Sequence, residues 1–320
     1  MVVSDLPMSF AVVFPGQGAA EPGLGQPWVD HPAWQVVEEA ESLLDRPIGR
    51  LLLAADAEEL GTTRASQLAV LVHSLMVWEA LSPSLPGLPV GFAGHSLGQV
   101  TALLASGVLS RGDGLRFAAE RADRSQDSAD ANPGRMAALI GATPEQAVAA
   151  CDGVDGAWLA NDNAPGQVVI AGTPDGIAAA GEQAKGSGVR RVLALDVGHA
   201  FHTPLLLDAA EALAPTLGEV TFHQPWAPVF TNTDAAPHAT ADGWPELLTR
   251  HLVEPVRWRE SQLALEAAGA RRFLEVGPGN VLAGLAKRTV PDIDVLGIHQ
   301  PDDIAVAVAA LGTSDLEPTR

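Results

Sequence analysis

Short apolar runs alternate with helical patterns along most of the chain. Residues 9–14 and 90–93 are short and almost entirely apolar, as in buried strands, and a glycine-containing turn follows each run. Between these runs, apolar residues recur at the spacing of one helix face, in two sets: Trp34, Val37, Ala40 and Leu44, and then Leu68, Leu71, Leu75 and Trp78. We expect both faces to be buried in the core rather than to bind a cofactor.

The middle of the chain follows a different order of elements. After the turn-forming residues 132–134, the pattern predicts strand, helix, strand, strand, helix and strand, at residues 136–140, 144–150, 157–160, 167–171, 174–186 and 190–196. This βαββαβ order is the signature of a ferredoxin-like α+β unit. We therefore predict a small ferredoxin-like subdomain over residues 132–198, inserted between two segments of a larger domain, residues 1–131 and 199–320.

Strands and helices alternate again in the last third of the chain. The pattern predicts an amphipathic helix over 205–217 and strands at 229–232, 273–276 and 295–298. Helices are predicted at 246–252 and 259–267, and a further helix follows each of the last two strands. A polar tail over 314–320 is expected to be frayed. Such alternation predicts an α/β domain with a parallel sheet.

Composition limits the class of protein. The chain has 320 residues, 47% of them hydrophobic and 18% charged, which is enough for a large core. Its net charge of −20 argues against nucleic-acid binding, because phosphates need a basic surface. No apolar stretch approaches the roughly eighteen residues of a membrane span, and residues 1–10 lack the basic start and apolar run of a signal peptide. We therefore expect a soluble, cytoplasmic protein that does not bind membranes.

A candidate nucleophile lies in Gly94-His95-Ser96-Leu97-Gly98, between the apolar run 90–93 and the small-residue helical stretch 100–105. Gly-x-Ser-x-Gly between a strand and a helix is typical of a nucleophile elbow, in which a strained turn exposes the serine hydroxyl. The start of the following helix favours a negative charge beside the serine. We predict that Ser96 is a nucleophile.

Other motifs allow a plain structural interpretation when each is taken alone. The Pro-Gly-Gln-Gly turn at 15–18 is also typical of an ordinary loop after a strand, and Arg121 and Arg124 fit one solvated helix face beside Glu120. The two histidines of His-Ala-Phe-His at 199–202 could contribute to a metal site. Because Cys151 is the one cysteine and no His-Glu-x-x-His pattern occurs, we expect no metal site and no internal disulfide.

Five motifs taken together resemble the malonyl-CoA:acyl carrier protein transacylase family. They are Phe-Pro-Gly-Gln-Gly at 14–18, Gly-His-Ser-Leu-Gly at 94–98, Glu-Arg at 120–121, His-Ala-Phe-His at 199–202 and Glu-Val-Gly-Pro-Gly-Asn-Val-Leu at 275–282. Their order and spacing match this family over nearly the whole chain. The resemblance implies an α/β fold with a hydrolase-like parallel-sheet core and an inserted ferredoxin-like α+β subdomain.

The resemblance also implies a role for each motif. Ser96 takes the acyl group as an ester and His202 is its base, oriented by the backbone carbonyl of His251, where many relatives carry glutamine. The backbone N–H groups of Gln17 and Leu97 form the oxyanion hole. Arg121 binds the free carboxylate of the substrate, as a planar guanidinium can do in bidentate fashion.

The resemblance further implies the substrates. The enzyme transfers malonyl from malonyl-CoA to an acyl carrier protein, with the coenzyme A thioester as substrate and no cofactor. His199 and Phe201 are the specificity residues, because His-Ala-Phe-His in this loop is typical of malonyl-selecting relatives. Packing against a methyl group discriminates only weakly, so some reaction with methylmalonyl is expected. The motif is commoner in polyketide than in fatty acid enzymes. We also expect a monomer.

Three alternatives stay open at this point. A serine hydrolase, such as an editing thioesterase acting on carrier-bound acyl groups, shares the elbow and the order of serine and histidine but needs no Arg121. A transferase for an unusual acyl unit fits the same motifs. A docking module without catalysis is the third alternative, which intact Ser96, His202 and Arg121 disfavour.

The acidic charge also constrains how a carrier protein could dock. Carrier proteins of the resembled family are usually acidic, so a local basic patch must overcome long-range repulsion. The candidates are three pairs: Arg190 and Arg191, Arg271 and Arg272, and Lys287 and Arg288. The last pair follows the 277–280 turn, and we expect it to contribute most.

Overall fold

The computed structural model describes residues 9–195, 197 and 199–312. Several sequence-based predictions extend beyond these residues. They concern the first eight residues, the end of the predicted strand at Asp196, the re-entry of the chain at Gly198 and the polar tail 314–320.

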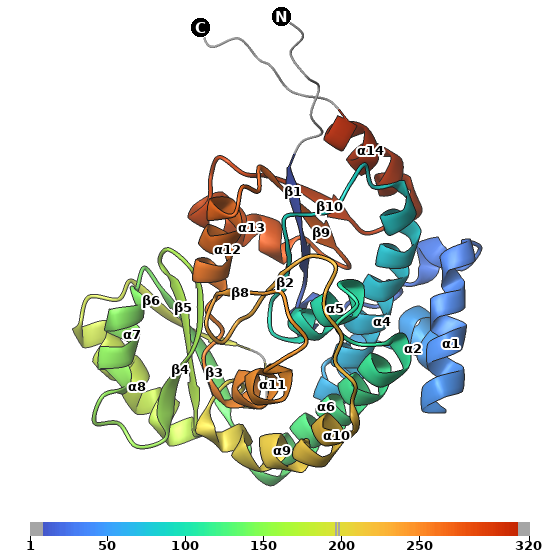
Figure 1. Cartoon of the computed structure of the whole chain (residues 1–320). Helices are drawn as coiled ribbons and strands as arrows, with labels where there is room; N and C mark the ends of the chain where they lie inside the picture. Colours follow the sequence, from blue (N-terminus) through green and yellow to red (C-terminus); the bar gives the residue numbers. More distant parts are fainter. Residues whose placement is uncertain (1–8, 196, 198, 313–320) are drawn as a thin grey trace, which may run out of the picture.

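A six-stranded sheet forms the centre of the larger part of the molecule (Figure 1). Its order is β10-β9-β1-β2-β7-β8, and all neighbours pair in parallel except β7 and β8. The strands are β1 (Phe10–Phe14), β2 (Phe92–Gly94), β7 (Val229–Phe230), β8 (Pro237–His238), β9 (Arg272–Val276) and β10 (Asp294–Ile298). The predicted α/β class with a parallel-sheet core is confirmed.

Helices cover both faces of this sheet. Side chains alternate along β1, so Val12 packs with α4 and α5 on one face while Val13 packs with α12 and α13 on the other. The helices of this part are α1 (Gln35–Leu44), α2 (Ile48–Ala54), α3 (Ala57–Leu60), α4 (Thr63–Leu81), α5 (Leu97–Ala105), α6 (Arg111–Ala131), α9 (Leu207–Ala212), α10 (Ala214–Glu219), α11 (Trp244–Val253), α12 (Trp258–Ala267), α13 (Val281–Thr289) and α14 (Pro301–Gly312).

Helix α4 corrects one expectation from the sequence. The stretch Thr63–Ser84 is long and apolar enough to cross a membrane by length and composition, although no such stretch was expected. In the structure, 83% of its most apolar window is buried inside the protein. Burial of this kind is typical of a core helix, and both predicted apolar helix faces, on α1 and α4, lie in the main core.

A second, four-stranded sheet forms the smaller part, shown in green in Figure 1. Its elements are β3 (Arg135–Ile140), α7 (Pro144–Cys151), β4 (Ala157–Ala164), β5 (Gln167–Gly172), α8 (Pro174–Gly186) and β6 (Arg191–Leu195). The strand order β4-β5-β3-β6 is antiparallel throughout, as in a ferredoxin-like unit. The inserted ferredoxin-like subdomain is thus confirmed as an architecture, whereas its limits at residues 132 and 198 stay a prediction.

The helix predicted over residues 205–217 is wrong in its continuity. The chain forms a 3₁₀ turn at Pro204–Leu206 and then two short helices, α9 and α10. The break falls just before Pro215, which lacks the N–H needed to continue a helix. Helices α2 and α3 and the two-residue strand β8 were not predicted, because they are too short to show a clear periodicity.

Candidate active site

A strained turn at the carboxyl end of β2 carries Ser96. The serine has φ 51° and ψ −112° and directly precedes helix α5. A methyl group on Gly94 would overlap the Gly98 carbonyl, and one on Gly98 would overlap the Phe14 carbonyl. The two glycines therefore let β2, β1 and α5 meet closely enough to form the nucleophile elbow that the sequence predicted.

The histidine loop brings His202 to this serine. Ser96 Oγ lies 2.7 Å from His202 Nε2, and His202 Nδ1 lies 2.9 Å from the backbone oxygen of His251 in α11. Since a carbonyl can only accept, Nδ1 carries the proton and Nε2 is free to accept the serine proton. His202 also has a positive φ, 60°, so both residues of this pair sit in a costly backbone conformation.

Burial keeps the imidazoles around Ser96 neutral. Desolvation and the positive charge of Arg121 lower the pKa of His202 to about 3. The same two causes lower the pKa of His251 well below its ordinary value. A neutral His202 is the form that can act as a base, and a neutral His251 adds no charge beside it.

Arg121 is buried, against the interpretation of a solvated face. Its side chain is 3% exposed and its Nη1 donates to Oε1 of Gln67 at 2.5 Å. None of the carboxylates in the described ranges forms an ion pair with it, and desolvation lowers its pKa to about 10. Since an unpaired buried cation is costly, this arginine is a candidate for binding an anion.

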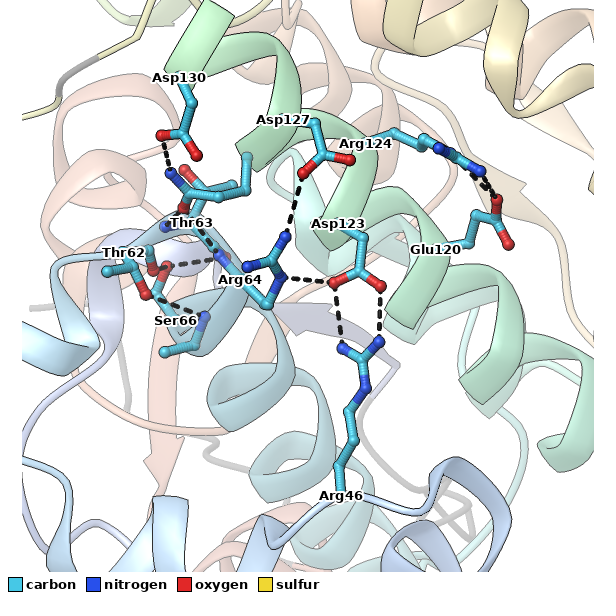
Figure 2. A network of polar contacts seen from close by, with 12 residues as sticks. Arg46, Thr62, Thr63, Arg64, Ser66, Glu120, Asp123, Arg124, Asp127 and Asp130 are labelled. Carbon is cyan, nitrogen blue, oxygen red and sulfur yellow. Dashed lines mark hydrogen bonds and ion pairs between the residues drawn. The ribbon is translucent and has the colours of Figure 1, made fainter.

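The other arginine of the proposed face behaves as a surface residue. Figure 2 shows Arg124 turned toward Glu120, one helical turn away, at 2.9 Å. Beside it, Asp123 accepts from both Arg46 and Arg64, and Arg64 also pairs with an aspartate one turn further along α6. Each of these exposed or half-buried arginines has a carboxylate partner, which distinguishes them from Arg121.

Two backbone N–H groups, of Gln17 and Leu97, have no acceptor among the residues that the structure describes. Gln17 begins the 3₁₀ turn after β1, and Leu97 begins α5 directly after Ser96. In the described part of the chain, neither N–H donates a hydrogen bond to another residue. Because β1 and β2 are parallel neighbours, both groups lie at the same edge of the sheet as the serine.

A cleft of about 580 Å³ opens at this edge, between the two sheets. Ser96, His202 and Gln17 line it from the large part, and Met136, Val169 and Leu195 line it from the small sheet. Phe201 also lines the cleft, while His199 is buried and packs edge-to-face against Phe201 with ring centroids 5.0 Å apart. Desolvation lowers the pKa of His199 to about 4. His199 thus supports the position of Phe201 and is not itself part of the wall.

The sequence analysis missed three polar residues of the site. Asn232 accepts from the Ser96 N–H at 2.8 Å, and Gln67 bridges Arg121 to the Gln17 side chain, with 2.9 Å between Gln67 Nε2 and Gln17 Oε1. Asn163 contacts His95 of the elbow at 2.8 Å. Each partner is more than 45 residues away along the chain, so no local pattern could reveal these contacts.

The surroundings of two of the proposed docking pairs bear on their role, which stays a prediction. Arg272 is 5% exposed and pairs with Asp294 at 2.9 Å, so it is too buried to contact a carrier protein. Arg271 precedes β9 at the opposite edge of the parallel sheet from Ser96. Arg288 is exposed but its guanidinium donates to the Pro165 carbonyl and to Gln167 Oε1, tying α13 to the small sheet.

Among the described residues, no group of three or more His, Cys, Asp or Glu side chains could hold a metal ion. His199 and His202 therefore do not belong to such a group. The expectation that the protein uses no cofactor stays a prediction.

Known proteins share this arrangement over nearly the full chain. Residues 11–315 match the family described as acyl transferase domain. The malonyl CoA-acyl carrier protein transacylase of Salmonella typhimurium is 34% identical, over 93% of this chain and 98% of its own length. The transacylase of the same name from Bacillus subtilis is 35% identical, over 94% of this chain and 96% of its own length.

Solved structures agree with the sequence relatives. The malonyl CoA-acyl carrier protein transacylase of Coxiella burnetii superposes with a TM-score of 0.92 at 30% identity, over 96% of this chain and 99% of its own. A malonyl-transacylase solved in complex with its type II polyketide synthase acyl-carrier protein gives 0.90 at 32% identity, over 94% and 99%. The chain is therefore an acyltransferase enzyme that belongs to the malonyl CoA-acyl carrier protein transacylase family.

Proposed function

We propose that this enzyme transfers a malonyl group from coenzyme A to the phosphopantetheine thiol of an acyl carrier protein, through a malonyl ester on Ser96. The observation that carries the proposal is the buried Arg121, which has no described carboxylate partner and whose charge acts on His202. Family membership supports the same reaction, because the relatives above are named for it.

The first half-reaction forms the ester. Ser96 Oγ attacks the thioester carbonyl while His202 Nε2, 2.7 Å away, takes the hydroxyl proton. The Oγ–C bond forms, the C–S bond breaks, and His202 returns the proton to the departing coenzyme A thiolate. In the second half-reaction the carrier thiol attacks the ester carbonyl: the S–C bond forms, the Oγ–C bond breaks, and the thiol proton passes through His202 to Ser96 Oγ.

The negative oxygen of each tetrahedral intermediate needs donors. The unpaired N–H groups of Gln17 and Leu97 are suited to this role, because Gln17 lines the cleft and Leu97 directly follows Ser96, which also lines it. The Ser96 N–H is already bonded to Asn232, which leaves the Gln17 and Leu97 groups as the proposed oxyanion hole. Each donor of this kind lowers the free energy of the transition state by about 3 kcal/mol.

Arg121 is proposed to bind the free malonyl carboxylate. A guanidinium binds a carboxylate in bidentate fashion, so a dicarboxylic acyl group gains an ion pair that an acetyl group cannot form. Phe201 lines the cleft, and we propose that its ring disfavours a methyl branch on the acyl group. Packing of this kind contributes only about 1–3 kcal/mol, so methylmalonyl is expected to react slowly rather than not at all.

The proposal also covers the oligomeric state, the cellular compartment and the cofactors of the enzyme. We propose a monomeric enzyme that acts in the cytoplasm, where it supplies extender units for fatty acid or polyketide synthesis. Coenzyme A enters as the thioester substrate, and the proposed chemistry needs no other cofactor.

Mass spectrometry of the acceptor tests the proposal. The enzyme is mixed with malonyl-CoA and a holo acyl carrier protein, and the loaded carrier and free malonate are both measured. We expect the carrier to gain malonyl faster than malonate appears, and to gain acetyl only slowly from acetyl-CoA. Release of free malonate without loading of the carrier would instead identify a hydrolase or editing thioesterase.

A further inference from the structure

The side chain of Asn232 clamps the elbow from one side. Its Oδ1 accepts from the Ser96 N–H at 2.8 Å, and its Nδ2 donates to the Gly94 carbonyl at 2.8 Å. One amide thus holds both ends of the turn that exposes the serine. The orientation of the amide is fixed, because an N–H can only donate and a carbonyl can only accept.

The backbone of Asn232 is held just as firmly. Its N–H donates to Oε1 of Gln99 in α5 at 2.6 Å, and its carbonyl accepts from the Arg257 N–H at 3.0 Å. The residue has no exposed surface. It follows β7, the strand that pairs with β2, so the sheet itself places it beside the elbow.

The same oxygen also reaches the base. Oδ1 of Asn232 lies 3.2 Å from Nε2 of His251, whose backbone carbonyl accepts from His202 Nδ1. Because Oδ1 accepts, the neutral His251 ring donates from Nε2. The contacts close a ring that runs from Ser96 through His202, His251 and Asn232 back to Ser96.

We propose that Asn232 is a positioning residue for the reaction, which holds Ser96 in its strained conformation and, through His251, fixes the His202 ring against the serine. Positive φ at both Ser96 and His202 costs free energy, so the geometry needs partners that determine it. Within the described ranges, Asn232 is the one side chain bonded to both the serine backbone and the residue that orients the base. This inference rests on the proposed function.

A fluorophosphonate probe tests the inference without any acyl substrate. Ser96 Oγ attacks phosphorus, fluoride leaves, and His202 takes the hydroxyl proton, so the labelling rate reports the same nucleophile and base. In Asn232→Ala the Gly94 carbonyl and the Ser96 N–H lose their partner. We expect labelling and malonyl-serine formation to slow about 100-fold, with the KM for malonyl-CoA changed less than about threefold.

The pH dependence in Asn232→Asp separates positioning from a merely structural role. The titratable and charged groups that face His202 are Arg121 and the rings of His95 and His251, which burial keeps neutral, and none of them is a carboxylate. A carboxylate at position 232 favours the protonated imidazole, so the acid limb of the labelling rate should move to higher pH by about one unit. An unchanged limb would contradict the inference.

Ser261→Ala is the matched control. Ser261 is buried and donates to the Thr231 and Arg257 carbonyls beside Asn232, but it contacts neither Ser96 nor His202. We expect it to lower the Tm without slowing labelling or moving the pH limb. If Asn232→Ala labels within twofold of wild type, the positioning role is wrong and the proposed function stands. If wild type labels with the probe but takes no malonyl, the proposed function fails and the role of Asn232 is still decided by the variants.

Discussion

Arg121 Nη1 lies 2.5 Å from Oε1 of Gln67, and this neutral amide takes the place of the carboxylate that a buried arginine usually pairs with. The amide leaves the positive charge of Arg121 uncompensated. Gln67 continues to the side chain of Gln17 at the cleft, so the arginine is connected to the substrate site through one polar bridge. An incoming carboxylate is the natural counter-ion for this charge.

Removing Arg121 should change the choice of acyl group. We expect Arg121→Ala to lower kcat/KM for malonyl-CoA by about 100-fold while acetyl transfer is kept or increased, because the ion pair forms only with a dicarboxylate. The measurement is the ratio of malonyl to acetyl kcat/KM. Arg124→Ala is the control on the same helix, since Arg124 pairs with Glu120 on the exposed face. A ratio that stays the same in Arg121→Ala would remove the arginine from the site.

Ser96 should be the one point of covalent attachment. Intact-mass analysis after malonyl-CoA should show one malonyl group on the wild type and none on Ser96→Ala, because among the described residues Ser96 has the one hydroxyl bonded to His202 Nε2. Cys151 is the competing nucleophile, but burial raises the pKa of its thiol to about 11 and leaves it protonated at neutral pH. Cys151→Ser should therefore be acylated as the wild type is. Malonyl found on Ser96→Ala would contradict the assignment of Ser96 as the attachment point.

The acylation rate should stay nearly flat well below neutral pH. Burial and Arg121 lower the pKa of His202 to about 3, so the ring remains an unprotonated base until the pH falls toward that value. An ordinary histidine, with a pKa of about 6.5, would lose most of its activity by pH 5.5. The check is the rate of malonyl-serine formation between pH 5 and 8. In Arg121→Ala the lowering charge is absent, so any acid limb should appear at higher pH; a limb near 6.5 in the wild type would contradict this.

Carrier docking should depend on cations at the cleft edge. Lys287 and Arg190 are both exposed. Arg190 lies against the turn at Gly141. The Gly141 N–H donates to the carbonyl of Gly166, which lies beside Arg288. Because Arg288 also holds the two sheets together, Lys287→Glu with Arg190→Glu is the cleaner charge reversal. We expect the KM for the carrier to rise about fivefold or more and its salt dependence to flatten, with self-acylation by malonyl-CoA unchanged.

The control for docking is Arg271→Glu. It makes the same kind of charge change at the opposite edge of the parallel sheet. We expect it to leave the KM for the carrier within about twofold, since exposed charges more than a Debye length apart are largely screened. If the Lys287 and Arg190 reversals act no more strongly than Arg271→Glu, the carrier docks elsewhere.

Local patterns in the sequence were sufficient for most of the longer elements and for the strained turn at Ser96. Helical spacing predicted α1 and α4, the βαββαβ order predicted the small sheet, and Gly-x-Ser-x-Gly predicted the elbow at Ser96. These features depend on residues a few positions apart, because side-chain periodicity and turn strain are set within one or two turns of the chain. The roles of His202, Arg121 and Gln17 came from the family resemblance, and their catalytic roles stay predictions.

Only the tertiary structure decided which polar groups meet. The sheet order sets β7 beside β2 and thereby brings Asn232 to Ser96, and the packing of α4 on α6 pairs Gln67 with Arg121. The same packing buries α4, which by composition alone could span a membrane, and separates Arg121 from Arg124 although they are three residues apart. Burial and long-range hydrogen bonds depend on which elements become neighbours, and that choice is made by the whole core rather than by any one stretch of sequence.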